Sequence, residues 1–286
     1  MGKRSPSKAI QIFCVLAWGS SYVAIKIGLE SFTPSQVASY RFFIAGIVSL
    51  VFILVNRVSI PTVNQLFRIL SIGFFGIFLY HISITYFTVH FQPNVVSFVS
   101  NTAPIFMILF SRYFLADNPQ TIRWSGFVLA LVGIGLMNFG KEIHLDWKQV
   151  GLLSIPVSGA LFFILQKPLL RTMKSTDMMH LCIVCGALML IAYDFSFFKM
   201  IPIASAESHI AIIFLGIIPT VLAFQLWSRL LSQTNVSNLS SPIYLVPPST
   251  ILFSFLFLRQ LPELLTVIGG FLTIIGVVIT KRKKTC

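Results

Sequence analysis

Long runs of uncharged, mostly apolar residues limit this chain to very few folds. Residues 151–166 form one such run and residues 211–227 form another. A strand that spans a membrane would instead show about ten residues of alternating apolar and polar character. Inside lipid, every backbone amide must be hydrogen-bonded within the protein, and a continuous apolar segment achieves this as an α-helix. The runs therefore predict membrane-spanning helices.

The composition agrees with a protein that lies almost entirely in a membrane. Of the 286 residues, 56% are apolar and 10% are charged, whereas a soluble domain has about 25% charged residues. These values exclude a soluble globular enzyme, a disordered protein and a disulfide-rich secreted domain. The 21 Lys and Arg against 8 Asp and Glu give a formal net charge of +13, but so few charged residues disfavour a nucleic-acid-binding face.

Ten predicted spans account for most of the chain. Because a spanning helix needs about 20 residues, ten helices and short loops fill a chain of this length. The expected bounds are residues 9–28, 36–55, 66–89, 94–114, 121–139, 149–167, 178–195, 209–231, 238–258 and 263–280. We predict an all-α integral membrane protein with ten transmembrane helices.

Lysine and arginine indicate the orientation, because short cytoplasmic loops carry an excess of both. With the N-terminus in the cytoplasm, the 15 basic residues on the inner side are Lys3, Arg4, Lys8, Arg57, Arg68, Arg112, Arg123, Lys167, Arg171, Lys174, Arg229, Lys281, Arg282, Lys283 and Lys284. The 6 on the outer side are Lys26, Arg41, Lys141, Lys148, Lys199 and Arg259. We therefore expect both ends of the chain in the cytoplasm.

The second half of the chain repeats the first at a spacing of 143 residues. Between residues 97 and 133, 12 of 37 positions are identical to the position 143 residues later, including Pro104 with Pro247 and Gly133 with Gly276. We predict two five-helix repeats, residues 1–140 and 141–286. An odd number of spans turns the second repeat upside down in the membrane, which is the inverted plan of many secondary transporters. A duplicated membrane protein without a transport role is the alternative.

Several short motifs follow one another along the first half. They are WGSSYVAIK at 18–26, YRFFIAG at 40–46, APIF at 103–106, FLAD at 114–117 and the glycine-spaced residues 126–135. Their order, together with the repeat, resembles the EamA family of the drug/metabolite transporter superfamily over nearly the whole chain. The resemblance implies two inverted five-helix repeats, cytoplasmic termini and a central cavity lined mainly by spans one, three, four, six, eight and nine. Members move amino acids, other metabolites, nucleotide-like molecules or drugs, so the resemblance names no substrate.

The chain departs from the family pattern in its second half. An acid often follows the fourth and ninth spans; Asp117 occupies the first place, but Gln260 aligns with it in the second repeat, and Glu263 lies nearby. The sixth span often carries an aromatic–small pair, whereas here Leu161 aligns with Trp18.

Polar and aromatic side chains in the cavity-lining spans are the candidates for substrate contact, because polar groups in lipid are costly and tend to face the bundle interior. No Asp or Glu lies deep in these spans, which disfavours a dedicated carrier of organic cations. Hydroxyls, amides and aromatic rings suit a neutral, zwitterionic or aromatic solute. The predicted substrate-binding residues are Trp18, Tyr22, Tyr80, His81, Asn101, Phe162, Gln166, Gln225 and Tyr244.

Two of the polar residues have competing interpretations. His81 is the one group deep in a cavity span that can change charge near neutral pH. It contacts the substrate or couples transport to protons; alternatively, it is hydrogen-bonded to a neighbouring helix. Arg41 flanks the first outer loop with Lys26. It draws an anion such as a carboxylate to the outer mouth, or it extends to lipid headgroups.

Prolines and glycines indicate where helices bend and pack. Pro104 and Pro247 lie mid-span at equivalent positions, and each is expected to remove a helical hydrogen bond. Matched hinges and static kinks both fit, and we group these prolines with Arg41 as candidate gating or hinge residues. The glycines of the fifth and tenth spans predict close helix packing, which would extend to a dimer contact.

The functional prediction is a secondary transporter that moves a small metabolite by alternating access, with amino acids or related zwitterions and aromatics as the leading substrates. The alternative is a carrier of a larger metabolite, such as S-adenosylmethionine or another nucleotide derivative. An intramembrane enzyme is the remote alternative, since only His81 with Ser83 approximates a catalytic pair. We expect no cofactor, metal or nucleic acid. The expected partners are the substrate, the lipid bilayer and a coupling proton or exchanged solute, in a monomer or homodimer of a bacterial inner membrane.

Overall fold

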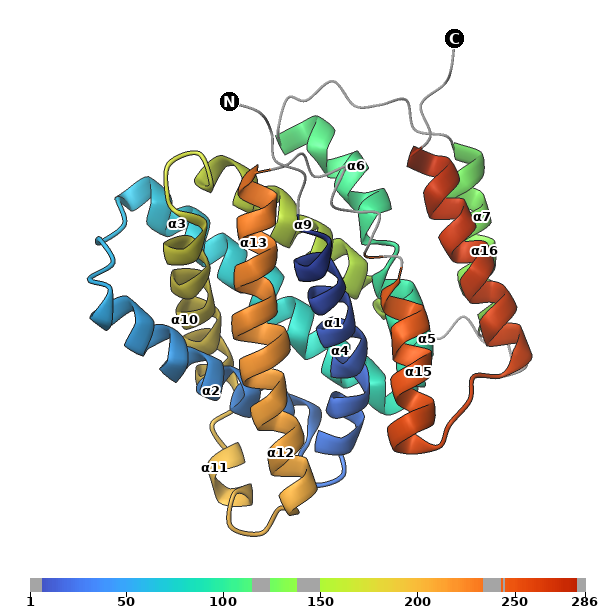
Figure 1. Cartoon of the computed structure of the whole chain (residues 1–286), viewed down its shortest axis with the longest axis horizontal. Helices are drawn as coiled ribbons and strands as arrows, with labels where there is room; N and C mark the ends of the chain where they lie inside the picture. The colour runs from blue at the N-terminus through green and yellow to red at the C-terminus, as the bar shows by residue number, and fades with distance from the viewer. Residues whose placement is uncertain (1–6, 115–123, 138–149, 234–242, 244, 282–286) are drawn as a thin grey trace.

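The structure is a computed structural model that describes residues 7–114, 124–137, 150–233, 243 and 245–281. Within these ranges, every regular element is a helix. Figure 1 shows the helices as one bundle, with the start of α1 (Lys8–Gly28) and the end of α16 (Leu264–Lys281) at the same end. Five stretches are long and apolar enough to cross a membrane: Lys8–Gly28, Pro34–Val55, Val63–His90, Ser175–Tyr193 and Ala206–Gln233. The chain is an integral membrane protein.

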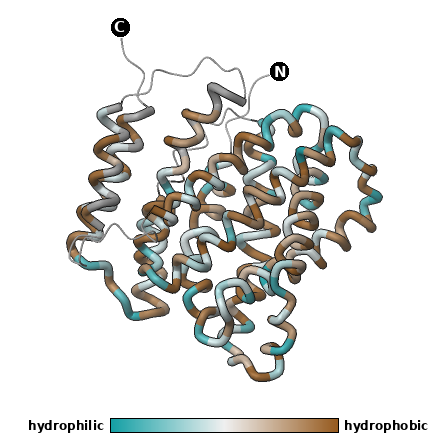
Figure 2. Tube along the Cα trace, turned by 180° about the vertical axis from the view of Figure 1, so that it is seen from behind, coloured by the Kyte–Doolittle hydropathy of each residue, from teal (hydrophilic) through white to brown (hydrophobic). Residues whose placement is uncertain are grey.

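Large apolar side chains lie on the outside of this bundle. Leu54, Phe67, Ile210 and Phe257 are each exposed by about two thirds or more of their surface. Figure 2 shows hydrophobic residues along the lengths of the helices and hydrophilic ones gathered in the turns at their ends. A soluble protein rarely exposes so much contiguous apolar surface, whereas the hydrocarbon core of a bilayer accommodates it.

The first half of the chain builds the elements α1 to α7. Helix α2 (Pro34–Val55) follows α1 after a short turn, and Thr33 with Gln36 forms a capping box at its start. The third span is continuous and comprises α3 (Val63–Ile72), the π-helical segment η1 (Gly73–Leu79) and α4 (Tyr80–His90). Helices α5 (Pro93–Ser100), α6 (Ala103–Phe114) and α7 (Trp124–Met137) complete this half.

The second half repeats part of this order of elements. It contains α9 (Ser154–Leu169), α10 (Ser175–Tyr193) and the single turn α11 (Phe197–Met200). The next span again joins two helices through a π-helical segment, namely α12 (Ala206–Leu215), η2 (Gly216–Leu222) and α13 (Ala223–Gln233). Helix α15 (Val246–Leu258) precedes α16.

The sequence repeat has a direct counterpart in these bounds. Adding 143 to the first and last residue numbers of α3, η1 and α4 gives the first and last residue numbers of α12, η2 and α13. Both π-helical segments begin at a glycine, Gly73 and Gly216, although the two sequences share little else. A π-helical turn inside an α-helix often marks a functional site, and here it occurs twice at equivalent places.

Helices α7 and α16 pack closely against each other, at one side of the bundle in Figure 1. A Cβ atom on Gly133 would lie 2.5 Å from the carbonyl oxygen of Gly269, and one on Gly276 would lie 2.6 Å from that of Gly126. Going from Gly126 to Gly133 along α7, the facing residue on α16 changes from Gly276 back to Gly269, so the two helices are antiparallel. The glycine pattern predicted close packing, and Gly133 and Gly276 provide it within the chain.

Replacing Gly276 by leucine is expected to destabilise the protein. The new side chain would collide with the backbone of α7 at Ala130, 2.5 Å from its nitrogen, and such overpacking costs about 1–3 kcal/mol. The melting temperature of the detergent-purified variant should fall. Val132→Leu is the control, because this side chain on α7 is half exposed and should change the melting temperature little. Equal melting temperatures for the two variants would contradict the close contact.

Two details of the predicted spans need correction. The predicted span 94–114 is interrupted, because α5 ends at Ser100 and α6 begins at Ala103, with a turn at Asn101 and Thr102 between them. Pro104 is compatible with the interruption, because a proline has no N–H to donate to the carbonyl oxygen of Ser100 in a continuous helix. In the ninth span, α15 begins at Val246, while residues 238–242 and 244 lie outside the described residues.

The prediction that both prolines break hydrogen bonds within a helix is wrong. Pro104 is the second residue of α6, and Pro247 is the second residue of α15. In the first turn of a helix the backbone N–H has no intrahelical acceptor, so proline is well tolerated there. The two residues start equivalent helices, and their role as hinges stays a prediction.

Candidate functional site

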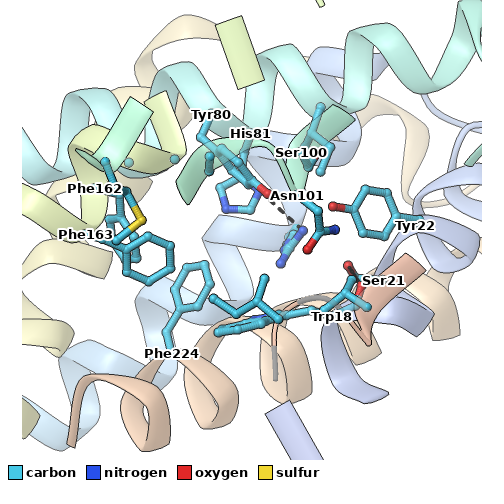
Figure 3. A pocket seen from close by; sticks show the side chains of 18 residues that line it. Trp18, Ser21, Tyr22, Tyr80, His81, Ser100, Asn101, Phe162, Phe163 and Phe224 are labelled. Atoms are coloured by element: carbon cyan, nitrogen blue, oxygen red, sulfur yellow. Dashed lines mark hydrogen bonds between the residues drawn. The ribbon is translucent and has the colours of Figure 1, made fainter. Parts of the chain in front are cut away.

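A cavity of about 90 Å³ lies in the interior of the bundle. Eighteen residues from both halves of the chain line it (Figure 3). Helices α1, α4, α5, α6, α9, α13 and α15 and segment η1 all contribute, which are the spans that the family resemblance implied, and α2 contributes as well. Six of the predicted substrate-binding residues line the cavity: Trp18, Tyr22, Tyr80, His81, Asn101 and Phe162.

The local sequence explains why one side of α1 faces the cavity. Trp18 and Tyr22 are four residues apart and therefore lie on the same face of the helix, with Ser21 beside them. Trp18 is held in place because its Nε1 donates a hydrogen bond to the carbonyl oxygen of Pro219 in η2, at 3.2 Å. Its ring also meets Trp227 edge-on, with 4.9 Å between ring centroids.

Aromatic rings form one end of the cavity. Figure 3 shows Phe162, Phe163 and Phe224 gathered there, with Tyr80 and His81 beside them. The ring centroid of Phe162 lies 5.4 Å from that of Phe163 and 5.3 Å from that of Phe224. The first contact is edge-on and the second is tilted, and both geometries are favourable for aromatic pairs. This end can hold an apolar or aromatic group.

Polar groups form the other end. Figure 3 shows Ser21, Tyr22, Ser100 and Asn101 there. The amide nitrogen of Asn101 donates to the carbonyl oxygen of Ser97 at 2.7 Å, but its Oδ1 is buried and has no hydrogen-bond partner among the described residues. A buried acceptor without a donor is costly, so this atom is available to a hydrogen-bond donor on a bound solute.

A charged group lies at the same cavity. Arg41 is 2% exposed, and its Nε donates to Thr220 Oγ1 at 2.7 Å. Its Nη1 lies 3.4 Å from Nδ1 of His81. Helix α2 can approach η2 this closely because Gly216 has no side chain; a Cβ there would lie 2.9 Å from the carbonyl oxygen of Arg41.

The contact with Arg41 determines the tautomer of His81. Guanidinium nitrogens only donate hydrogen bonds, so Nδ1 of His81 accepts and the neutral ring carries its proton on Nε2. His81 is 2% exposed, and its Nε2 has no partner among the described residues. The ring packs on Phe42, with 4.6 Å between centroids, and edge-on to Tyr80 at 5.0 Å. The cavity therefore offers one free N–H donor from His81.

The alternative that Arg41 extends to lipid headgroups is wrong, because its side chain is buried, and its role at an outer mouth stays a prediction. Arg41 lies eight residues beyond Thr33, the N-cap of α2, which at 1.5 Å per residue is about 12 Å along the helix. Its side chain turns into the bundle because Thr220 and His81 supply hydrogen-bonding groups there.

Two other predicted residues, Gln166 and Gln225, do not line the cavity. Gln166 is buried and its Nε2 donates to the carbonyl oxygen of Phe162 at 3.0 Å. Gln225 is half-buried, and neither glutamine is among the residues around the cavity. Tyr244 lies outside the described residues. Binding roles for these three stay predictions.

Sequence reasoning missed several lining residues. Ser21 and Ser100 add hydroxyls, Phe163 and Phe224 add rings, and Gly76 and Gly159 leave room for Phe162 and Tyr80. The repeat held a signal for one of them, because adding 143 to 81 gives 224. His81 and Phe224 are equivalent positions, and their rings meet at 6.1 Å.

The helices and the cavity define an integral membrane protein with a central cavity lined by residues from both halves of the chain. The sequence profile of the EamA-like transporter family matches residues 9–139 and residues 147–282. The chain therefore belongs to the EamA-like transporter family, within the drug/metabolite transporter superfamily.

Known relatives extend over nearly the whole chain. An uncharacterized transporter of Bacillus subtilis, YdfC, is 26% identical over 269 residues, which cover 93% of this chain and 88% of that protein. A probable terminal-alkyne amino-acid exporter of Streptantibioticus cattleyicolor is 24% identical, covering 97% of this chain and 94% of that protein. One crystal structure matches with a TM-score of 0.65 and 16% identity, over 95% of this chain and 94% of that one. This last likeness concerns the fold alone.

Proposed function

We propose that the protein is a secondary transporter that moves amino acids or closely related small solutes across a bacterial inner membrane. The observation that carries the proposal is the cavity, which combines Arg41, His81 and Asn101 with a wall of aromatic rings. Such a mixture suits a solute with a polar head and an apolar side group. The relative named as a probable amino-acid exporter supports the same substrate class.

The size of the cavity favours a small solute over a nucleotide derivative. Pockets for drug-sized ligands have volumes of about 300–1,000 Å³, whereas this cavity has about 90 Å³. A solute as large as S-adenosylmethionine would require the helices to separate considerably.

We propose alternating access as the mechanism, with ten spans in two inverted five-helix repeats and both termini in the cytoplasm. Three observations support this architecture: the spacing of 143 residues between equivalent elements, the family match in each half of the chain, and the antiparallel contact of α7 with α16. Two similar halves of opposite orientation can exchange conformations, so that the site between them opens to one side and then the other.

Cysteine labelling tests the inversion with a pair of equivalent positions. Asn56 and Lys199 are 143 residues apart, and both are exposed. In a background without the native cysteines, Lys199→Cys is expected to react with a membrane-impermeant maleimide from outside intact cells. Asn56→Cys should react only after the membrane is opened. Labelling of both positions from the same side would contradict the inverted repeat.

The transport function itself is tested in proteoliposomes. A thermal-shift screen of amino acids first identifies solutes that stabilise the purified protein, because a ligand of the folded state raises its stability. Counterflow of the radiolabelled solute should then be saturable and leave it chemically unchanged. Conversion of the solute to a product would point to an enzyme instead, and exchange that depends on a pH gradient would identify proton coupling. If none of the tested amino acids exchanges across the membrane, the proposed substrate class is contradicted.

A further inference from the structure

Arg41 is a buried positive charge, and such a group requires compensation. A cation in a membrane interior is costly unless an anion or several hydrogen-bond acceptors face it. Its guanidinium carbon lies 5.5 Å from the ring centroid of Phe42, and its described hydrogen-bond partners are two neutral groups, Thr220 and His81. These satisfy two of the five N–H donors that a guanidinium carries.

The acids that the structure describes do not supply the missing charge. They lie between helices or in the first turn of a helix. They are Glu30, Asp177, Asp194, Glu207 and Glu263. Among the eighteen residues that line the cavity, none is acidic. Within the described part of the chain, the positive charge of Arg41 therefore has no acidic partner at the cavity.

The chemistry of the site indicates which anion fits. One guanidinium forms two parallel hydrogen bonds to a carboxylate, and its planar fork matches that geometry. The N–H of His81 Nε2 is a further donor, and the Oδ1 of Asn101 is an acceptor without a partner. A solute with a carboxylate and an amino group beside it would offer a partner to all three kinds of group that line the cavity.

The other end of the cavity determines the rest of the solute. Phe162, Phe163 and Phe224 line it, and the described residues around them bring no charged group. An apolar side group fits this wall, whereas a second charge would lose its hydration without compensation.

We infer that Arg41 binds the carboxylate of the transported solute, which is a monocarboxylate with an apolar side group. This inference rests on the proposed function, because it assigns a role at the same site. The alternative is a purely structural role, in which Arg41 only connects α2 with η2 and α4 through Thr220 and His81.

A series of four compounds tests the inference on the wild-type protein. L-Leucine carries both the carboxylate and the amine, 4-methylpentanoate lacks the amine, L-leucinamide lacks the carboxylate, and isoamylamine lacks it as well. Binding to purified protein in detergent is measured by isothermal titration calorimetry. We expect the two carboxylates to bind and the two compounds without a carboxylate to bind at least about 10-fold more weakly, as for lost hydrogen bonds to a charged group.

Variants separate a carboxylate contact from a structural one. Arg41→Gln should remove the preference for leucine over leucinamide, so that the two affinities differ by less than about 2-fold. Arg41→Lys keeps the charge without the planar fork and should retain part of the preference. Arg68→Gln removes an exposed charge on α3 and should leave the preference unchanged. Should Arg41→Gln fail to fold, the wild-type series and Arg41→Lys still decide the question.

Each outcome has a different meaning. Leucinamide that binds wild type as tightly as leucine would overturn the inference and leave the proposed transporter intact. Binding of 4-methylpentanoate alone, lost in Arg41→Gln, would support the inference and contradict an amino-acid substrate. A preference for carboxylates that survives in Arg41→Gln would overturn the assignment to Arg41. If none of the four compounds binds, both the inference and the proposed amino-acid substrate are contradicted.

Discussion

Replacing Gly76 by leucine is expected to abolish substrate binding. Gly76 lies in the π-helical segment η1, at the cavity wall. A Cβ atom on it would lie 2.0 Å from Cδ2 of Phe162 and 2.7 Å from its Cβ. Because the collision reaches the base of the phenylalanine side chain, a ring rotation alone cannot relieve it. Leucine would push α9 away from η1 and fill space that the solute requires.

The measurement is the substrate-induced thermal shift, followed by counterflow in proteoliposomes. For Gly76→Leu we expect no saturable exchange, together with a loss of stability of about 1–3 kcal/mol from overpacking. Gly186→Leu is the matched control, since its Cβ would collide with Ile77 of the same segment at 2.3 Å, yet Ile77 does not line the cavity. It should lose stability similarly but retain binding.

A second pair of variants tests whether the steric explanation is correct. Gly76→Ala alone should weaken binding, and combining it with Phe162→Leu should restore part of it, because the smaller side chain leaves room for the new methyl group. Residues in contact show such coupling, whereas independent sites have additive effects. Additive losses in the double variant would contradict the close contact of η1 with α9.

The described fold follows largely from properties that are local in the sequence. Continuous apolar runs predicted helices at all the places where long helices are found, and the spacing of 143 residues predicted equivalent elements. The interruption at Asn101 and Thr102 was harder to predict, because Pro104 tolerates both a kinked helix and a turn followed by a new helix. Which of these forms depends on the neighbours of the segment.

The site was predictable where residue type alone limits the options. Tyr22, His81 and Asn101 carry polar groups within apolar helices, and they line the cavity. The alternative that placed Arg41 at lipid headgroups failed because only its nearness to a predicted loop was visible in the sequence. The orientation of its side chain depends on Thr220, a residue 179 positions away in the chain. Gly76 carries no chemical signal of its own, since its importance lies in Phe162.

Replacing His81 by phenylalanine is expected to weaken substrate binding by about 10- to 150-fold, the range that corresponds to a hydrogen bond of about 1.5–3 kcal/mol to a charged group. The substitution removes the free N–H donor at Nε2 and the acceptor of Arg41 at Nδ1. It retains an aromatic ring among Phe42, Tyr80 and Phe224, so packing should change little.

The comparison with two other variants decides between a substrate contact and a structural histidine. His81→Ala loses the ring as well, so it should reduce both affinity and melting temperature. His180→Phe replaces another buried histidine, stacked on Phe52 at 3.9 Å and away from the cavity, and should leave affinity unchanged. Affinity is measured by titration calorimetry and stability by thermal melting. If His81→Phe binds substrate like wild type, His81 does not contact the solute, and its role is to support Arg41 and the packing of α4. A loss of affinity without a loss of stability would instead show that His81 serves binding, either through its free N–H or through the position of Arg41 that Nδ1 holds.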